Sequence, residues 1–484
     1  MYKGPYTQCD MSDARCLLLP ENGACKKQMV CMALELSRLV YDMDIAPCLD
    51  AGWEDISFVV DELLQTGLHG KDAKARRACL QAAARARGRL EKSDPISQLR
   101  GFRRQKEALD TCKAMIMAKA LNEERTMIVI SFAGTTRRLY EWLGNLRLEE
   151  EAGFHAGFLR LTQQFEEKAS QVLFPLTAQK MGFSRLTLTD VLQHLRLGSE
   201  RFQVFVTGHS QGAALMQTYI HRLIASGVGR ERLGGIGFAS PAVVHDRALC
   251  WATDYPIRHF INADDLVARV GGSMHIGLCS VLPVSAAYRR ACYGPKAGEA
   301  CMQALLWLLH SLRGTQDTLL FAIALMDVLG TLEESVSEEM MRAVARSFMP
   351  DALAQRFKGY TRRIVHALTR RLEAKCIAVT GRVDEEKRAC LRERINDLFL
   401  QYGAQKVMEM LFEVMLRPHA LADKENPRAY QLLAKEYTRK LATTLWLESD
   451  MPVWDMQFGV RDGRRRRAYH RLRPMQSERE NRRK

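Results

Sequence analysis

The feature that most constrains this chain is the run Gly-His-Ser-Gln-Gly at residues 208–212, which stands between two segments of different character. Residues 202–206, directly before it, form the short, mostly apolar run of a buried strand, and apolar residues recur at helical spacing from Ala213 onward. The two glycines are needed on so sharp a turn, since a side chain at either one would collide with the neighbouring strand or helix. We therefore expect Ser210 to lie exposed at the tip of a strand, in the turn known as a nucleophile elbow.

Strands and helices alternate along the chain on both sides of this turn. Short apolar runs predict buried strands at residues 127–132, 202–206, 235–239 and 257–261. Helical spacing covers residues 158–173 and 211–226. This alternation predicts an α/β fold in which a mostly parallel sheet is flanked by helices. Ligands bind such sheets at the carboxyl ends of the strands, where Ser210 is expected.

The remaining segments suggest five regions. Residues 1–121 are predicted as an N-terminal helical region, with helices over 26–66, the second from Phe58 to about Thr66, and a basic helix within 71–106. Residues 122–296 form the α/β core, and 297–416 read as a large helical insertion that would act as a cap or lid. The other two regions are a C-terminal helical segment over 417–460 and a basic tail over 461–484, for which we expect disorder.

The net charge of +15 is concentrated in the basic tail, which holds 11 Lys and Arg against three Asp and Glu. Two interpretations remain open: a tail that binds an anionic partner, such as anionic lipid or nucleic acid, and a solvated tail without a partner. Its one aromatic residue, Tyr469, argues against recognition of nucleic-acid bases.

The thirteen cysteines show no C-x-x-C pair or other metal spacing, and several, such as Cys31, Cys250 and Cys301, lie in apolar surroundings. This pattern indicates buried, reduced thiols. The N-terminus lacks the apolar core of a signal peptide, and no apolar run reaches the roughly 18 residues of a membrane span. We therefore expect a cytoplasmic protein, with peripheral contact to anionic membranes as a further expectation.

Several motifs follow one another in the order found in the class 3 lipases, the fungal-lipase-like branch of the α/β-hydrolases. The segments that carry the resemblance are Leu36–Asp42, Phe132-Ala133-Gly134-Thr135-Thr136 with Trp142-Leu143 and Asn145-Leu146, His155-Ala156-Gly157-Phe158, Gly208–Gly212, Phe238-Ala239-Ser240-Pro241, Asn262-x-x-Asp265-x-Val267 and His275-x-Gly277. The resemblance covers roughly residues 30–280. Alanine replaces a residue that is usual in the family at four places beside the catalytic positions: Ala133, Ala239, Ala242 and Ala268.

The resemblance implies a catalytic triad and an oxyanion hole. Ser210 takes the position of the nucleophile and Asp265 that of the triad acid, with the neighbouring Asp264 as the less favoured choice. The backbone N–H groups of Thr135 and Gln211 would form the oxyanion hole. No metal and no organic cofactor is implied.

The triad histidine is the least determined member of the site. The order Ser, Asp, His along the chain favours a histidine after Asp265, and His155 and His275 occupy family positions that are not the base. His419 lies in a loop before a predicted final helix and is our first choice, and His310 is the second.

The resulting hypothesis is a serine hydrolase that cleaves acyl esters of lipids through an acyl-enzyme, as a lipase, phospholipase or esterase. The alternative is a catalytically inactive protein of the same fold that serves as an interaction module, with its basic tail binding anionic partners. The uncertain histidine keeps this alternative open. The oligomeric state is not predicted.

Overall fold

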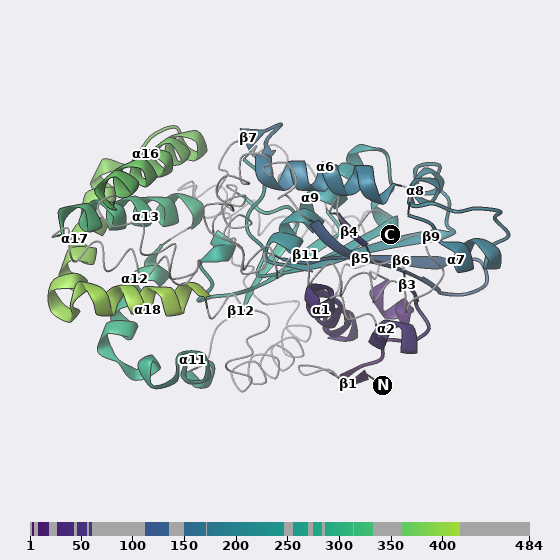
Figure 1. Cartoon of the computed structure of the whole chain (residues 1–484), viewed down its shortest axis with the longest axis horizontal. Coiled ribbons are helices and arrows are strands. Elements are labelled where there is room, and N and C mark those ends of the chain that lie inside the picture. The colour runs from purple at the N-terminus through teal and green to yellow at the C-terminus, as the bar shows by residue number, and fades with distance from the viewer. Residues whose placement is uncertain are drawn as a thin grey trace, which may run out of the picture.

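The computed structural model describes residues 2–3, 8–18, 27–42, 46–55, 58–60, 112–134, 150–170, 172–245, 255–269, 274–282, 286–312, 314–332 and 361–416. An α/β body and a block of helices lie side by side along the longest axis (Figure 1).

The α/β body is built on one sheet of eight strands, in the order β12-β11-β10-β9-β6-β5-β3, with β4 also paired to β5. The strands are β3 (Glu54–Asp55), β4 (Phe58–Val60), β5 (Cys112–Ala120), β6 (Thr126–Phe132), β9 (Phe202–His209), β10 (Leu233–Phe238), β11 (Ile257–Asn262) and β12 (Leu278–Leu282). Within this sheet the neighbouring pairs β6–β9, β9–β10, β10–β11 and β11–β12 are parallel. Strand β5 pairs antiparallel with β6, β3 and β4. The predicted mostly parallel sheet is therefore confirmed.

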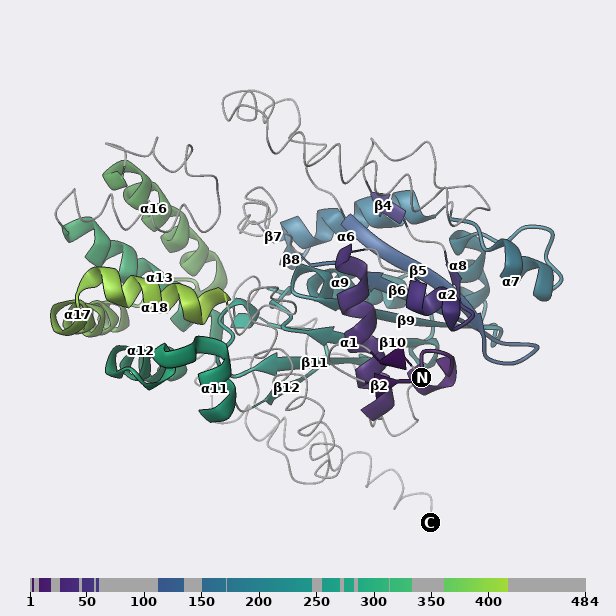
Figure 2. The ribbon, with the colours of Figure 1, turned by 60° about the horizontal axis from the view of Figure 1, so that its bottom comes forward.

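Helices cover both faces of this sheet. Helix α1 (Lys27–Asp42) lies on one face, and α6 (Ala156–Ala169) and α9 (Gln211–Ala225) lie on the other (Figure 2). Because side chains alternate along a strand, Phe205 of β9 packs into the apolar cluster on the α1 side, while Val204 and Val206 pack into the cluster on the α9 side. This double burial explains why the strand reads as a nearly continuous apolar run.

Shorter elements complete the body: β1 (Tyr2–Lys3), β2 (Gln8–Cys9), η1 (Ala14–Leu17), α2 (Ala46–Asp50), β7 (Glu150–Glu151), β8 (Phe154–His155), α7 (Pro175–Lys180), α8 (Leu188–Arg196), η3 (Arg230–Arg232) and η4 (Val267–Arg269).

The helical block follows β12. Its elements are α11 (Ala286–Tyr293), η5 (Gly294–Gly298), α12 (Ala300–Ser311), α13 (Gly314–Thr331), α16 (Thr361–Thr380), α17 (Glu385–Tyr402) and α18 (Ala404–Leu416). Most of the apolar residues of α12 and α13 are packed in a core, as expected, although Trp307 is 71% exposed. Arg388 of α17 binds Asp327 of α13 and Glu373 of α16, so ion pairs as well as apolar packing join these helices.

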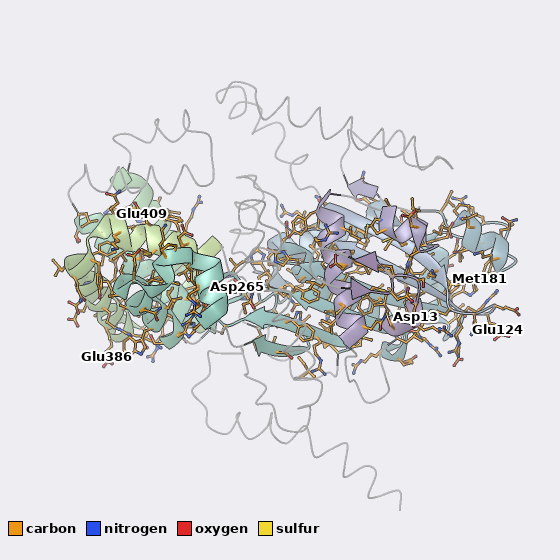
Figure 3. The ribbon with its side chains drawn as sticks, turned by 90° about the horizontal axis from the view of Figure 1, so that it is seen from below. Asp13, Glu124, Met181, Asp265, Glu386 and Glu409 are labelled. Carbon is orange, nitrogen blue, oxygen red and sulfur yellow. The ribbon has the colours of Figure 1, made fainter. Side chains whose placement is uncertain are left out.

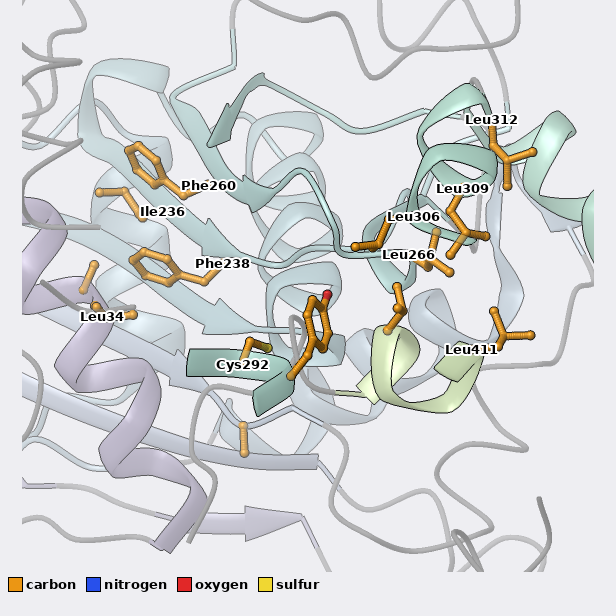
Figure 4. Close-up of a cluster of buried hydrophobic side chains, with 14 of the residues drawn as sticks. Leu34, Ile236, Phe238, Phe260, Leu266, Cys292, Leu306, Leu309, Leu312 and Leu411 are labelled. Carbon is orange, nitrogen blue, oxygen red and sulfur yellow. The ribbon is translucent and has the colours of Figure 1, made fainter. Parts of the chain in front are cut away.

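One apolar cluster joins the helical block to the α1 side of the sheet. Its members include Phe238 and Phe260 at the sheet, Leu266 just past β11, and Leu306 and Leu411 of the block (Figure 4). The two parts of the molecule therefore share a single core.

Two secondary-structure predictions were wrong. The helix expected from Phe58 is strand β4 where it is described, because Phe58-Val59-Val60 pairs with Ala114, Lys113 and Cys112 of β5. Strand β5 lies within the region predicted as helical, since its Met and Ala residues favour helices and only its neighbours in the sheet make it a strand.

Several predictions concern residues outside the described ranges: the basic helix within 71–106, the segment 417–460, the tail 461–484, Cys250, Thr135 and His419. Cys31 and Cys301 are buried, as expected. Within the described ranges, no helix is both long enough and apolar enough to cross a bilayer.

Candidate active site

Ser210 stands on the turn between β9 and α9 with φ 56° and ψ −127°. Residues other than glycine rarely adopt a positive φ, and such a conformation costs about 1–3 kcal/mol unless its surroundings hold it in place. Here the Ser210 N–H donates to the carbonyl of Phe238 at 3.0 Å, and the Ser210 carbonyl accepts the N–H of Ala213 at 2.9 Å. These bonds fix the predicted elbow between β10 and the first turn of α9.

The two glycines of the elbow are required by close backbone packing. A Cβ on Gly208 would lie 2.4 Å from the carbonyl carbon of Gly212, and a Cβ on Gly212 would lie 2.2 Å from the carbonyl oxygen of Phe132. Both distances are shorter than any normal contact, so the reason expected for the glycines is confirmed.

Ser210 is buried in this structure. Only 7% of the residue is exposed, as is 7% of the neighbouring Gln211. The expectation of an exposed serine was therefore wrong for this structure, although the turn that presents it is as predicted.

The loop after β6 touches the elbow. Gly134 lies so close that a Cβ on it would be 3.1 Å from Cβ of Ser210 and 2.5 Å from the carbonyl oxygen of His209. The proposed oxyanion donor Thr135 follows Gly134 but lies outside the described residues. The second donor, Gln211, is the first residue of α9, where helix N–H groups lack intrahelical partners and the helix dipole favours an anion.

Asp265 is fully buried just past the end of β11. Its N–H donates to the carbonyl of Asn262 at 3.0 Å, and its Oδ1 accepts the N–H of Val267 at 2.9 Å. Figure 3 shows Asp265 where the helical block meets the α/β body. The backbone on either side therefore fixes this carboxylate at the same edge of the sheet as Ser210, since β9 and β11 run parallel within the sheet.

Asp264 has a different set of partners. Arg289 of α11 binds both of its carboxylate oxygens, at 2.9 and 2.7 Å, and the hydroxyl of Tyr293 lies 3.3 Å away. Nε2 of His310 lies 2.6 Å from Oδ1, so the second candidate for the triad base is held by Asp264. Burial by itself would raise the pKa of Asp264, but the hydrogen bonds from His310 and Arg289 outweigh it and lower that pKa.

Comparison with protein families supports the resemblance seen in the sequence. The family model described as lipase (class 3) matches residues 129–274. This matched segment is therefore similar to the class 3 lipases. It contains β6 from Val129 onward, the elbow, Asp265 and the chain as far as Met274.

Solved structures with some similarity are fungal lipases. A lipase from Rhizopus microsporus var. chinensis is 16% identical at a TM-score of 0.26, covering 35% of this chain and 57% of its own. The native Rhizomucor miehei lipase propeptide complex is 22% identical at a TM-score of 0.27, covering 36% of this chain and 53% of its own. The chain thus spans little more than half the length of these lipases. Comparison with curated protein sequences gave no match.

Two buried histidines, His259 and His275, hold neighbouring loops in place. Nε2 of His275 donates to the carbonyl of Ser240 at 2.7 Å, and Nε2 of His259 donates to the carbonyl of Ile276 at 2.8 Å. Burial lowers the pKa of His275 to about 4. Burial, and then the neighbouring His275, lowers the pKa of His259 to about 3. Both are therefore neutral near pH 7.

Sequence analysis missed two polar residues that make hydrogen bonds around the candidate site. Gln217 of α9 donates to Ser240 Oγ at 2.6 Å and to the carbonyl of Pro241 at 3.0 Å, and it accepts the N–H of Ile276 at 2.8 Å. Tyr41 of α1 lies beside His209 of the elbow. A buried glutamine in an otherwise apolar helix was the available signal for the first; Tyr41 had only its place in a helix that resembles the family.

No group of three or more potential metal ligands occurs among the described residues. Among the described residues, the candidate site consists of Ser210, the first turn of α9, and the carboxylates of Asp264 and Asp265.

Proposed function

We propose that the protein is a serine ester hydrolase of the lipase class, which cleaves acyl esters of lipids through an acyl-enzyme. The observation that carries the proposal is the positive φ of Ser210 at a strand–helix turn. This turn lies inside residues 129–274, which match the class 3 lipase family model. A hydroxyl needs such a turn to stand at the tip of a strand beside an oxyanion site, whereas an ordinary strand–helix connection needs no strained serine.

In the proposed reaction, Ser210 Oγ attacks the ester carbonyl while its proton passes to the imidazole of His419. The negative charge that forms on the carbonyl oxygen is stabilised by the N–H groups of Thr135 and Gln211. The imidazolium then gives its proton to the leaving alcohol, and the acyl group remains on Ser210. Water, deprotonated by the same imidazole, releases the acid and restores the serine.

Asp265 is the better candidate for the acid that orients the base. A triad aspartate stabilises an imidazolium with its negative charge. The charge of Asp264 is already balanced by two hydrogen bonds from Arg289, and its lowered pKa reflects these partners. This pairing favours a structural role for Asp264 and His310, and it leaves His419 as the proposed base.

The substrate class follows from the family of residues 129–274, and the helical block supports the idea of a cap. Ser210 is only 7% exposed, and a cap that moves would give an ester access to it. The block stands beside Asp264, which Arg289 of α11 and His310 of α12 bind, at the carboxyl ends of the strands. A net charge of +15 would favour peripheral contact with an anionic lipid surface.

A serine-directed fluorophosphonate tests the proposal directly. The full-length protein should be labelled at one residue, and Ser210→Ala should abolish the labelling. Hydrolysis of short and long nitrophenyl esters should be lost in His419→Ala and retained in His310→Ala. Absence of labelling of the folded wild type would overturn the proposal in favour of an inactive interaction protein; loss of turnover in His310→Ala alone would reassign the base.

A further inference from the structure

Tyr41 stands at a junction between the two backbone segments that would form the oxyanion hole. Its hydroxyl lies 2.6 Å from Nδ1 of His209, the residue before the proposed nucleophile. The same hydroxyl is close enough to Gly134 that a Cβ there would lie 2.1 Å from it. Gly134 directly precedes Thr135, and His209 comes two residues before Gln211. One hydroxyl therefore contacts both segments at once.

Buried polar contacts fix α1 on the sheet and so fix Tyr41. The hydroxyls of Ser37 and Thr207 lie 3.0 Å apart, Ser131 Oγ donates to the carbonyl of Leu36 at 3.0 Å, and all three side chains are fully buried. Ser131 and Thr207 belong to β6 and β9, the strands that lead into the two segments. Tyr41 is four residues after Ser37, so it lies one turn further along the same helix face.

We infer that Tyr41 is a positioning residue of the oxyanion site, an inference that rests on the proposed function. Its hydroxyl, bonded to His209 and packed against Gly134, holds the loop after β6 at a set distance from the first turn of α9. Backbone donors stabilise an oxyanion only when both aim at the place where it forms. The hydrogen bond to His209 produces this effect because it fixes the imidazole next to the elbow, in a residue that is only 4% exposed.

Tyr41→Phe removes the hydroxyl and keeps the ring, and Tyr219→Phe is the matched control. Tyr219 lies on α9, and its buried hydroxyl has no hydrogen-bond partner among the described residues. Because a displacement of about 1 Å can lower a rate about a hundredfold, we expect Tyr41→Phe to lower kcat ten- to a hundredfold. KM should change less than twofold, fluorophosphonate labelling should slow by a similar factor, and Tyr219→Phe should match the wild type in all three.

A double-mutant cycle with His209→Leu tests the route of the effect. If Tyr41 acts through His209, Tyr41→Phe lowers kcat less than twofold in the His209→Leu background. Turnover is counted per active site by fluorophosphonate titration, so loss of folded protein does not mimic a loss of kcat. Equal kcat for Tyr41→Phe and Tyr219→Phe in an active enzyme would overturn this inference alone. A folded wild type that neither hydrolyses esters nor reacts with fluorophosphonate would overturn the proposed function, and this inference with it.

Discussion

Oδ1 of Asp264 lies 2.6 Å from Nε2 of His310, which links the loop just past the end of β11 to helix α12. Because a carboxylate only accepts hydrogen bonds, Nε2 of His310 carries the proton in this pair. Arg289 completes the arrangement from α11, so three segments far apart in the sequence meet at one carboxylate. Oδ1 of the adjacent Asp265 instead accepts the backbone N–H of Val267 in its own loop.

The different partners of Asp264 and Asp265 predict that substituting the first lowers mainly stability and substituting the second lowers mainly turnover. Asp264→Asn leaves Arg289 without its negative partner, and we expect it to lower the free energy of unfolding by about 2–4 kcal/mol. Asp265→Asn should lower kcat about 10³–10⁴-fold, with a smaller effect on stability, because it removes the charge behind the imidazolium. Urea unfolding and nitrophenyl ester hydrolysis measure the two quantities. If Asp264→Asn were the variant that lost turnover while keeping its stability, the roles assigned to the two carboxylates would be exchanged.

Stability should fall in mild acid because of the buried histidines. In the folded state burial lowers the pKa of His275 to about 4, and burial together with His275 lowers the pKa of His259 to about 3. In the unfolded chain both take up protons below pH of about 6.5. The free energy of unfolding is therefore undiminished above that pH and falls below it, by about 1.4 kcal/mol per pH unit for each histidine, until the folded-state pKa is reached.

Urea unfolding at pH 7.5, 6.5, 5.5 and 5.0 checks this slope. His275→Asn, which keeps a donor for the Ser240 carbonyl but does not titrate, should reduce the slope. A free energy of unfolding that stayed constant from pH 7.5 to 5.0 would contradict the neutral state assigned to these rings.

A single methyl group added at Gly212 should destabilise the elbow. Gly212→Ala places a Cβ 2.2 Å from the carbonyl oxygen of Phe132, so the backbone of α9 or β6 must shift. We expect a loss of about 1–3 kcal/mol in stability and a strong decrease in fluorophosphonate labelling. Gly298→Ala is the control, since nothing lies within 4 Å of its added Cβ. Equal labelling of the two variants would show that the close packing of the elbow is not needed for reactivity.

Ala239 gives a prediction of opposite sign. It follows β10 with φ 48°, in the left-handed region, where alanine is strained and glycine is not. Ala239→Gly should therefore stabilise the fold, by about 0.5–1 kcal/mol. Ala374→Gly, at an exposed position inside α16, should instead destabilise it by about 1 kcal/mol. A decrease in stability for both variants would rule out strain at Ala239.

The sequence predicts the elbow and its strands because their signals are local. A nearly continuous apolar run such as Phe202–Val206 indicates a strand that is buried on both faces. Gly208 and Gly212 indicate a sharp turn, because a side chain at either position would collide with backbone. Strand β5 could not be recognised in the same way, because its residues are equally suited to a helix and only pairing with β6 decides. Pairing between distant residues also explains why Gln217 and Tyr41 were missed: each acquires its role from partners brought close by folding.

The shared apolar cluster limits how this molecule can be divided for experiments. A fragment that stopped after η5 would lose the helices that cover Leu266 and Tyr293, and their apolar surface would face water. Such a fragment should aggregate on expression even though it holds the whole matched segment. Conversely, α12 to α18 produced alone would leave Leu306 and Leu411 without the apolar residues of the α/β body that share their cluster. Neither half is therefore expected to fold stably by itself.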